Sequence, residues 1–388
     1  MNASGLVIML ILISSCYPSS AATLNVCAEG CPYSRINEAI FSASPGDTVL
    51  VSSGTYREVV EIHENVSLQG QDSGQGRPVI QAADGLRPAV MIRASGASLD
   101  GFSIANAGGI GVVVEGDGNT VRGNGISSSR LGLAAAGQNH RITGNVLRGN
   151  DLGLLLEGEG SLVRGNLLAE NGQSLLIRFG GEHTVESNLV EYSRDVGVAL
   201  VEGGGNLLIN NTIVRNRDGL VLMSSGNLVV GNDLSNNSNQ SAFDSGSNRW
   251  DDGSLGNHYG VSGSTYAVPG GENVDRHPWT VRQAGSQLVD ALKAAELIRS
   301  GVVPIDVRTG QEYHLGHLPS AKNIDIMAPD FVSRAGQLDR EGRYLVYCRT
   351  GQRSLQADAI LQELGFSSIY LMVGGIFEWD SEGLPLAS

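Results

Sequence analysis

Short apolar segments recur at a regular interval between residues 98 and 235, and each is followed by a polar turn that ends in asparagine. The interval is 21 to 23 residues, and the apolar runs are only three to five residues long, without helical spacing. A repeat of this length with strand-like runs is typical of a β-solenoid, in which each coil buries its apolar face by stacking on the next. Successive copies are Thr120–Asn124, Arg141–Asn145 and Leu162–Asn166, and later copies end at Asn188, Asn211 and Asn232.

The asparagine stands at one fixed position of each copy. A side-chain amide can both donate and accept hydrogen bonds, so stacked asparagines can bond to the coils above and below them. We therefore predict a structural asparagine ladder at a turn of the solenoid, and no catalytic role for these residues.

The pattern changes after Trp279. Residues 280–287 are predicted to be a linker, and residues 288–298 have helical spacing and strong helix formers. Strand-like runs follow at 302–308, 344–347 and 369–373, with a further helix at 355–364 that ends at Gly365. Strands that alternate with helices indicate a parallel α/β sheet. The predicted fold class is therefore mixed, with an all-β region followed by an α/β domain over residues 288–388.

The N-terminus has the features of an export signal. Leu6–Ile13 is an unbroken apolar run, followed by small residues, and it is too short to span a bilayer. We predict a cleaved signal peptide over residues 1–22. The alternative is lipoprotein-type processing with Cys16 as the lipidated residue, and only this alternative would attach the protein to a membrane. Both predict a secreted or cell-surface protein.

Charge and cysteine content narrow the function further. The formal net charge of −14 argues against nucleic acid as a partner. In an exported chain, Cys27 and Cys31 are expected to form a disulfide. No Cys/His cluster completes a zinc site, so no metal is predicted. Cys348 is then the one unpaired thiol expected in the mature protein.

The N-terminal region resembles right-handed parallel β-helix proteins of the NosD-like group, which includes carbohydrate-binding and sugar-hydrolase proteins of archaeal surfaces. The opening residues that carry the resemblance are Cys27, 36–40, 45–49 and 54–56, and the closing ones are 248–259 and 269–278. The resemblance implies a β-helix over residues 23–279, capped by a helix near residues 33–44. Relatives often have an acidic insert where this chain has residues 260–265, so calcium binding is not predicted there.

Acidic polysaccharide cleavage by the β-helix would need grouped carboxylates and a nearby basic residue. The candidate residues on polar turns are Asp151, Asp195 and Asp218, with Arg178, Arg194 and Arg217. Their positions in successive coils do not coincide, so we interpret them as a solvated face.

Cys348 directly follows the apolar run 344–347 and opens the polar loop 349–354, ahead of a predicted helix. At such a position backbone amides and the helix dipole favour a thiolate, and two arginines flank it. The sequence therefore predicts an ionised, accessible nucleophile at the carboxyl end of a strand, where ligands bind in α/β sheets.

Residues 288–386 resemble the rhodanese family. The matching segments, in order, are 306–308 with 312–313, 316–319 with Ala321, the loop 348–354, 374–376 with Trp379, and 383–385. Related phosphatases and arsenate reductases have five residues between the cysteine and the arginine, whereas four separate Cys348 from Arg353 here. The shorter loop makes a smaller anion cradle, so the resemblance implies sulfur transfer through a Cys348 persulfide, without a cofactor.

In this hypothesis the loop residues bind the sulfur donor and the persulfide. Backbone amides of the loop would stabilise the persulfide, and its arginines would attract anionic donors. Three further residues would support the loop: Asp306 is expected to anchor Arg353, and Arg308 to pair with Glu312. The predicted substrate-binding residues are Arg349, Thr350, Gly351, Gln352, Arg353 and Ser354.

Two functions of different class follow. The first is an exported sulfurtransferase that takes sulfur from a small donor such as thiosulfate and passes it to a thiol, sulfite or cyanide-like acceptor. The second is a surface carbohydrate-binding or adhesive β-helix with an accessory rhodanese module. A polysaccharide lyase or hydrolase is a third, weaker alternative. A polysaccharide is therefore a possible partner of the β-helix in each case.

Overall fold

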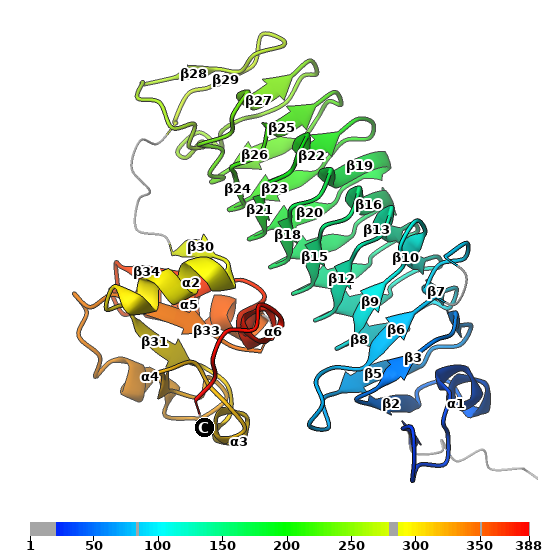
Figure 1. The fold of residues 1–388 in the computed structure, drawn as a ribbon. Helices are drawn as coiled ribbons and strands as arrows, with labels where there is room; N and C mark the ends of the chain where they lie inside the picture. The colour runs from blue at the N-terminus through cyan, green and yellow to red at the C-terminus, as the bar shows by residue number, and fades with distance from the viewer. Residues whose placement is uncertain (1–20, 83–84, 279–285, 350, 388) are drawn as a thin grey trace, which may run out of the picture.

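The computed structural model describes residues 21–82, 85–278, 286–349 and 351–387. It has two parts (Figure 1): a long stack of β-coils, and a smaller α/β domain that lies against the flank of the stack. Residues 1–20 of the predicted signal peptide, which include Cys16, lie outside these ranges, as do most of the linker 280–287 and Thr350. No helix in the described ranges is long and apolar enough to cross a membrane.

The stack is a parallel β-helix with three faces, which we name sheets A, B and C, and each strand pairs in parallel with its counterpart one coil away. Sheet A contains β1 (Thr23–Val26), β2 (Thr48–Ser52), β5 (Ser67–Gln71), β8 (Ser98–Asp100), β11 (Thr120–Arg122), β14 (Arg141–Thr143), β17 (Leu162–Arg164), β20 (Thr184–Glu186), β23 (Leu207–Ile209) and β26 (Leu228–Val230). Sheet B contains β3 (Thr55–Tyr56), β6 (Val79–Gln81), β9 (Ser103–Ala105), β12 (Gly125–Ser127), β15 (Val146–Arg148), β18 (Leu167–Ala169), β21 (Leu189–Glu191) and β24 (Thr212–Val214). Sheet C contains β4 (Val60–Ile62), β7 (Val90–Ile92), β10 (Ile110–Val114), β13 (Leu131–Ala135), β16 (Leu152–Glu159), β19 (Gln173–Gly181), β22 (Val196–Leu200), β25 (Asp218–Leu222) and β27 (Gln240–Asp244).

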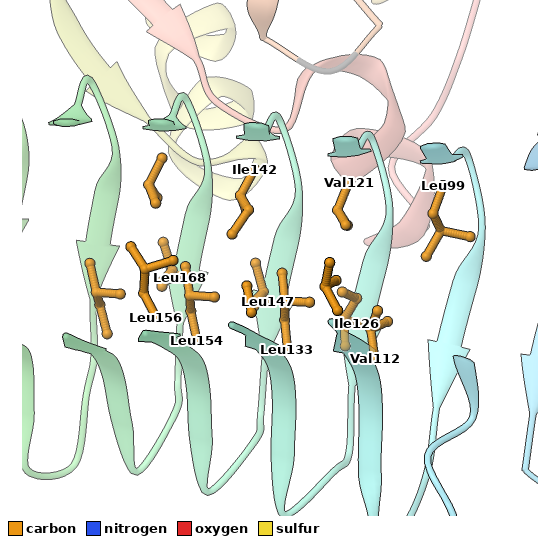
Figure 2. Packing of buried hydrophobic residues seen from close by; sticks show 14 of the residues in the cluster. Leu99, Val112, Val121, Ile126, Leu133, Ile142, Leu147, Leu154, Leu156 and Leu168 are labelled. Atoms are coloured by element: carbon orange, nitrogen blue, oxygen red, sulfur yellow. The ribbon is translucent and has the colours of Figure 1, made fainter. Parts of the chain in front are cut away.

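The core of the β-helix consists of aliphatic side chains stacked from coil to coil (Figure 2). In sheet A, Val121 pairs in register with Ile142, and Ile142 with Val163, and all three are at most 1% exposed. One aliphatic side chain from the middle of each short strand therefore points inward, and its two neighbours point outward. This alternation makes the outer face of sheet B available for contact with the second domain.

The predicted asparagine ladder is present. The Asn145 Nδ2 atom donates to Asn166 Oδ1 at 3.0 Å, and Asn166 Nδ2 donates to Asn188 Oδ1 at 3.0 Å. The ladder runs through every predicted member from Asn124 to Asn232 and ends at Asn257. Further ladders, which the sequence did not single out, lie at other corners of the coils and include the pairs Asn150–Asn171, Asn216–Asn237 and Asn206–Asn227.

The N-terminal end of the solenoid is covered by α1 (Ile36–Ser42), which is shorter than the helix predicted over 33–44. The Glu58 carboxylate accepts hydrogen bonds from the first backbone amides of α1, at 2.9 Å from Ile36 and 3.2 Å from Asn37. Cys27 and Cys31, the pair that the sequence predicts, form a disulfide ahead of this helix. At the other end of the stack, β28 (Tyr266–Ala267) and β29 (Val274–Asp275) form an antiparallel pair.

The C-terminal domain is a five-stranded parallel sheet with helices on its faces, in the strand order β30-β34-β33-β31-β32. Its strands are β30 (Gln287–Val289), β31 (Val303–Asp306), β32 (Lys322–Asn323), β33 (Tyr344–Tyr347) and β34 (Ile369–Met372). Its helices are α2 (Ala291–Arg299), α3 (Gly310–His314), α4 (Phe331–Ala335), α5 (Gln352–Glu363) and α6 (Gly375–Ser381).

One element of this domain differs from the sequence prediction. Residues 288–298 were expected to form one helix, but Leu288 and Val289 belong to strand β30, and the helix begins only at Ala291. Asp290 separates the two elements, because its carboxylate caps the helix by accepting a hydrogen bond from the Lys293 amide at 2.7 Å. Helix α5 likewise begins at Gln352, three residues before the predicted start at Leu355.

Candidate active site

Cys348 lies where strand β33 ends and the loop to α5 begins. Gly351, at the N-cap of α5, has a left-handed backbone with φ of 93°, which a residue with a Cβ rarely adopts. This turn points the Gly351 amide back at the cysteine, and the amide donates a hydrogen bond to Cys348 Sγ at 3.1 Å. The loop therefore presents a main-chain donor to the sulfur, as the sequence predicts.

The predicted accessibility of Cys348 is wrong for this structure. The residue is unpaired but only 1% exposed, and it belongs to an apolar cluster that includes Val346, Val373 and Phe377. The sequence pattern of a polar loop did not reveal this burial, because the apolar neighbours come from β33, from the segment after β34 and from α6. The sulfur still faces the loop, since it accepts the Gly351 amide.

The two arginine–carboxylate pairs that support the loop are the reverse of those predicted. Arg353 makes a bidentate pair with Glu312, with N–O distances of 2.7 and 2.6 Å, and does not pair with Asp306. Burial raises the pKa of Glu312, but hydrogen bonds from Arg353 and Thr309 outweigh this effect and bring the pKa to about 2. The pKa of Arg353 is raised, mainly by its hydrogen bonds to Glu312, against the effect of burial, and the nearby sulfur of Cys348 adds to the rise. Glu312 therefore holds the Arg353 guanidinium beside the nucleophile.

Asp306 instead binds Arg308, two residues later. Arg308 Nε lies 3.0 Å from Asp306 Oδ1, and Arg308 Nη2 donates to the Gly316 carbonyl at 2.7 Å. Asp306 is fully buried and Arg308 is only 6% exposed. This pair fixes the end of β31 to the segment around Gly316. It therefore supports the sheet and makes no direct contact with the Cys348 loop through these hydrogen bonds.

The remaining predicted residues are placed as follows. Ser354 is fully buried, and its Oγ has no hydrogen-bond partner among the described residues. His317 stacks on Tyr313 at a centroid distance of 3.8 Å. Trp379 is buried and its Nε1 donates to the Pro385 carbonyl at 3.0 Å. Both rings therefore pack within the α/β domain.

The sequence did not assign a role to α6 in holding the loop. The Ile376 amide donates to the Cys348 carbonyl at 2.9 Å, and the Phe377 amide donates to the Arg349 carbonyl at 3.2 Å. Gly375 makes this approach possible, because a Cβ there would lie 2.5 Å from the Cys348 carbonyl oxygen. In the sequence, the Gly-Gly pair 374–375 is the feature that could have indicated this close backbone approach.

The outer face of sheet B packs against this same region, and α6 lies next to β12 and β15 (Figure 1). Val146, Leu167 and Leu189 stand at equivalent outward positions of successive strands and are at most 7% exposed. The equivalent position in β12 is Gly125, and a Cβ there would lie 2.9 Å from the Phe377 ring. Because Gly125 has no side chain, the row of outward side chains on sheet B has a gap at this position, and the Phe377 ring occupies that gap.

An ion pair crosses the same interface. Arg148 Nη2 lies 2.9 Å from Glu378 Oε1, and the Glu378 side chain is fully buried. The pKa of Glu378 is raised well above its usual range by burial, and Arg148 opposes this shift. Sequence reasoning could not find this pair, because its members are 230 residues apart.

The candidate acids and arginines of the β-helix are held in ion pairs or hydrogen bonds to residues of other coils. The pairs are Arg194 with Asp151 at 3.6 Å, Arg217 with Asp195 at 3.0 Å, and Arg178 with Glu157 at 2.6 Å, and Asn239 donates to Asp218 at 2.6 Å. These contacts and their exposure favour the interpretation as a solvated face for Asp151 and Asp195, whose side chains are 74% and 58% exposed. The interpretation is wrong for Asp218, which is the first residue of β25 and only 7% exposed.

Comparison with protein families gives two matches. Residues 75–269 match the family described as "Periplasmic copper-binding protein (NosD)", and residues 289–382 match the rhodanese-like domain. The first match covers most of the coils, and the second covers nearly all of the α/β domain. The family description suggests an extracytoplasmic location.

Several named proteins are similar to the C-terminal domain. A sulfurtransferase of Allochromatium vinosum is 31% identical over 87 residues, which is 22% of this chain and 79% of that protein. Thiosulfate sulfurtransferase 16 of Arabidopsis thaliana is 31% identical over 107 residues, covering 25% of this chain and 89% of the relative. Among solved structures, a rhodanese-related protein from Thermoplasma volcanium is 30% identical, covers 26% of this chain and 97% of its own, and has a TM-score of 0.24.

The family description names copper, but the side chains present do not fit a resident copper ion. Across the described ranges, no three His, Cys, Asp or Glu side chains group closely enough to hold a metal. Burial lowers the pKa of His183 to about 4, and this ring accepts a hydrogen bond from the Ser161 amide at 3.1 Å. His258 pairs with Asp233 at 3.1 Å.

Proposed function

Because this chain belongs to the NosD family, on its match over residues 75–269, and carries a rhodanese-like domain over residues 289–382, we propose that it is an exported sulfurtransferase. Its nucleophile is Cys348, and the β-helix carries the domain outside the cytoplasm. The observation that supports this most directly is the hydrogen bond of 3.1 Å from the Gly351 amide to Cys348 Sγ, inside a loop braced by Arg353 and Glu312.

The proposed reaction has two steps. In the first, the Cys348 thiolate attacks the outer sulfur of thiosulfate. The bond between the two sulfurs of the donor breaks, its electron pair leaves with sulfite, and Cys348 becomes a persulfide. In the second, a thiol or cyanide attacks the terminal sulfur, and the electron pair of the persulfide bond returns to Cys348 as a thiolate.

The loop has two tasks in these steps. The Gly351 amide donates toward the sulfur that carries negative charge, which stabilises the thiolate and the persulfide without reorganisation. The Arg353 guanidinium adds positive charge, and Glu312 fixes its orientation through two hydrogen bonds. A small anionic donor fits this arrangement better than a neutral one.

The test is turnover of thiosulfate and cyanide to thiocyanate and sulfite by the whole chain. Cys348→Ser is expected to remove turnover completely while the thermal unfolding temperature stays near that of the wild type, because serine is nearly isosteric. Replacement of Tyr344, which precedes the site on the same strand, by phenylalanine is the matched control and is expected to remain active. Turnover that persists in Cys348→Ser at the wild-type rate would refute the proposal.

A further inference from the structure

Two arginines from different domains lie where the segment around Cys348 and helix α6 contact the β-helix. Arg349 directly follows the nucleophile, and its Nη2 lies 3.0 Å from the position that a Cβ of Gly101 would take on the β-helix. Arg77, which precedes strand β6, lies over the ring of Phe377 in α6. Both side chains are partly buried. Burial, and after it the charge of Arg349, hold the pKa of Arg77 well below its usual range.

The charges of Asp100, Asp380 and Asp72 oppose this lowering of the Arg77 pKa from a distance. Within the described ranges, no carboxylate lies at ion-pair distance from either guanidinium, and the nearby Asp100 pairs with Arg122 at 3.2 Å. Arg77 Nη1 donates to the Gly123 carbonyl, which holds the side chain in place and neutralises no charge. Two guanidinium groups that approach each other in a partly desolvated site repel, and a bound anion removes that cost.

A second observation concerns Ser354, in the first turn of α5. The buried Ser354 hydroxyl has no hydrogen-bond partner in the part of the chain that the structure describes. Buried polar groups are normally satisfied, and an unsatisfied one is a candidate contact for a ligand. The loop thus has an unused hydroxyl on the same segment that carries Arg349 and Cys348.

We propose that Arg77 of the β-helix and Arg349 of the loop together bind the oxoanion end of the sulfur donor, so that the active site is shared by both domains. This inference rests on the proposed function. The ligand class is a small sulfonate-type oxoanion, such as the SO₃ group of thiosulfate and the sulfite that leaves from it. Guanidinium groups match the oxygens of such groups with paired hydrogen bonds.

The overall charge of the protein makes a local positive site useful for binding an anionic donor. The chain carries a formal net charge of −14, which repels an anionic donor from most of its surface. A local pair of arginines next to the nucleophile offsets this repulsion at the place where the donor reacts. The β-helix therefore takes part in donor binding in addition to carrying the domain.

The experiment measures alkylation of Cys348 in the whole chain by two probes of similar size, iodoacetate and iodoacetamide, which differ in charge. Arg77→Gln is expected to slow the reaction with anionic iodoacetate about tenfold, the loss typical of one charge-assisted contact, and to leave the neutral iodoacetamide reaction unchanged. Arg77→Lys is expected to restore most of the iodoacetate rate. The matched control is Arg93→Gln, because Arg93 pairs with Glu115 beside sheet C and is half exposed.

An unchanged ratio of the two rates in Arg77→Gln would overturn the inference, whether or not the protein transfers sulfur. The same holds if both rates fall equally, since that would indicate a general disturbance of the loop. Should Arg77→Gln fail to fold, Arg349→Gln tests the opposite side of the same site with the same two probes. The two proposals can fail separately. If Cys348→Ser loses thiosulfate turnover but Arg77→Gln has the same ratio of iodoacetate to iodoacetamide rates as the wild type, the proposed function stands and the shared site is refuted.

Discussion

Replacing Arg148 by methionine should destabilise the contact between the two domains strongly. The substitution removes the partner of Glu378, whose side chain is fully buried and whose Oε1 lies 2.9 Å from Arg148 Nη2. Methionine keeps most of the aliphatic volume, so the main loss is electrostatic. Breaking one side of a buried ion pair costs about 3–5 kcal/mol, and we expect the lower value because Arg148 is itself 21% exposed. For a domain of this size, about 3 kcal/mol corresponds to a fall in Tm of more than roughly 10 °C.

The cost should also depend on pH. Burial raises the pKa of Glu378 well above its usual range, Arg148 opposes the shift, and Asp290, Glu191 and Glu382 add to it. A carboxyl whose pKa is higher in the folded than in the unfolded state binds a proton on folding. Its presence therefore reduces stability as the pH rises from the unfolded pKa of about 4.5 through the folded value. Without Arg148 this penalty grows, so the variant should lose more stability at pH 8 than at pH 5.

Differential scanning calorimetry at both pH values measures this effect. The double variant Arg148→Met with Glu378→Gln should recover much of the loss, because the fully buried carboxylate is removed together with its partner. Glu170 and Glu382 also lose Arg148, but their side chains are partly exposed to water. Arg178→Met is the matched control: its pair with Glu157 is 43% and 27% exposed and should contribute less than about 1 kcal/mol. A loss below about 0.5 kcal/mol for Arg148→Met, or an equal loss at pH 5 and pH 8, would refute the reasoning.

Three further outcomes follow from single contacts. Gly125→Val fills the gap that Phe377 occupies, 2.9 Å from the added Cβ, and should cost about 1–3 kcal/mol and enlarge the radius of gyration in X-ray scattering; an unchanged radius would contradict the docking. Glu312→Gln frees Arg353 and should lower thiocyanate formation at neutral pH, where the wild-type carboxylate is ionised because its pKa is about 2. Equal rates of the variant and the wild type at pH 7 would show that the pair is dispensable. Asn166→Ala removes hydrogen bonds of 2.8 and 3.0 Å and leaves their buried partners unsatisfied. The free energy of unfolding of the β-helix, measured by calorimetry, should fall by roughly 2–4 kcal/mol. Thiocyanate formation measured below the unfolding temperature should persist.

The sequence predicts best where a pattern repeats or a local motif is complete. The spacing of Asn145 and Asn166 is enough to locate a ladder, because a solenoid brings equivalent positions into register. The strand Tyr344–Tyr347 was predicted with its bounds, since it is a short apolar run followed by a polar loop. Family resemblance carried the identity of both domains, and the matched families confirm it.

The sequence predicts least where contacts join distant segments. The exchange of partners between Asp306, Arg308, Glu312 and Arg353 is decided by the path of the loops, which spacing alone does not specify. The burial of Cys348 likewise depends on side chains from separate elements. Strand β30 was missed because Asp290 ends one element and caps the next within a run of helix formers.

The most direct test of the account is the mass of the whole protein after exposure to thiosulfate, followed by mapping of the peptide that contains Cys348. The account predicts that this peptide gains the mass of one sulfur atom and loses it again on addition of cyanide. A wild-type Cys348 peptide whose mass stays unchanged under conditions where the buried thiol is alkylated by iodoacetamide would contradict the proposed sulfur transfer.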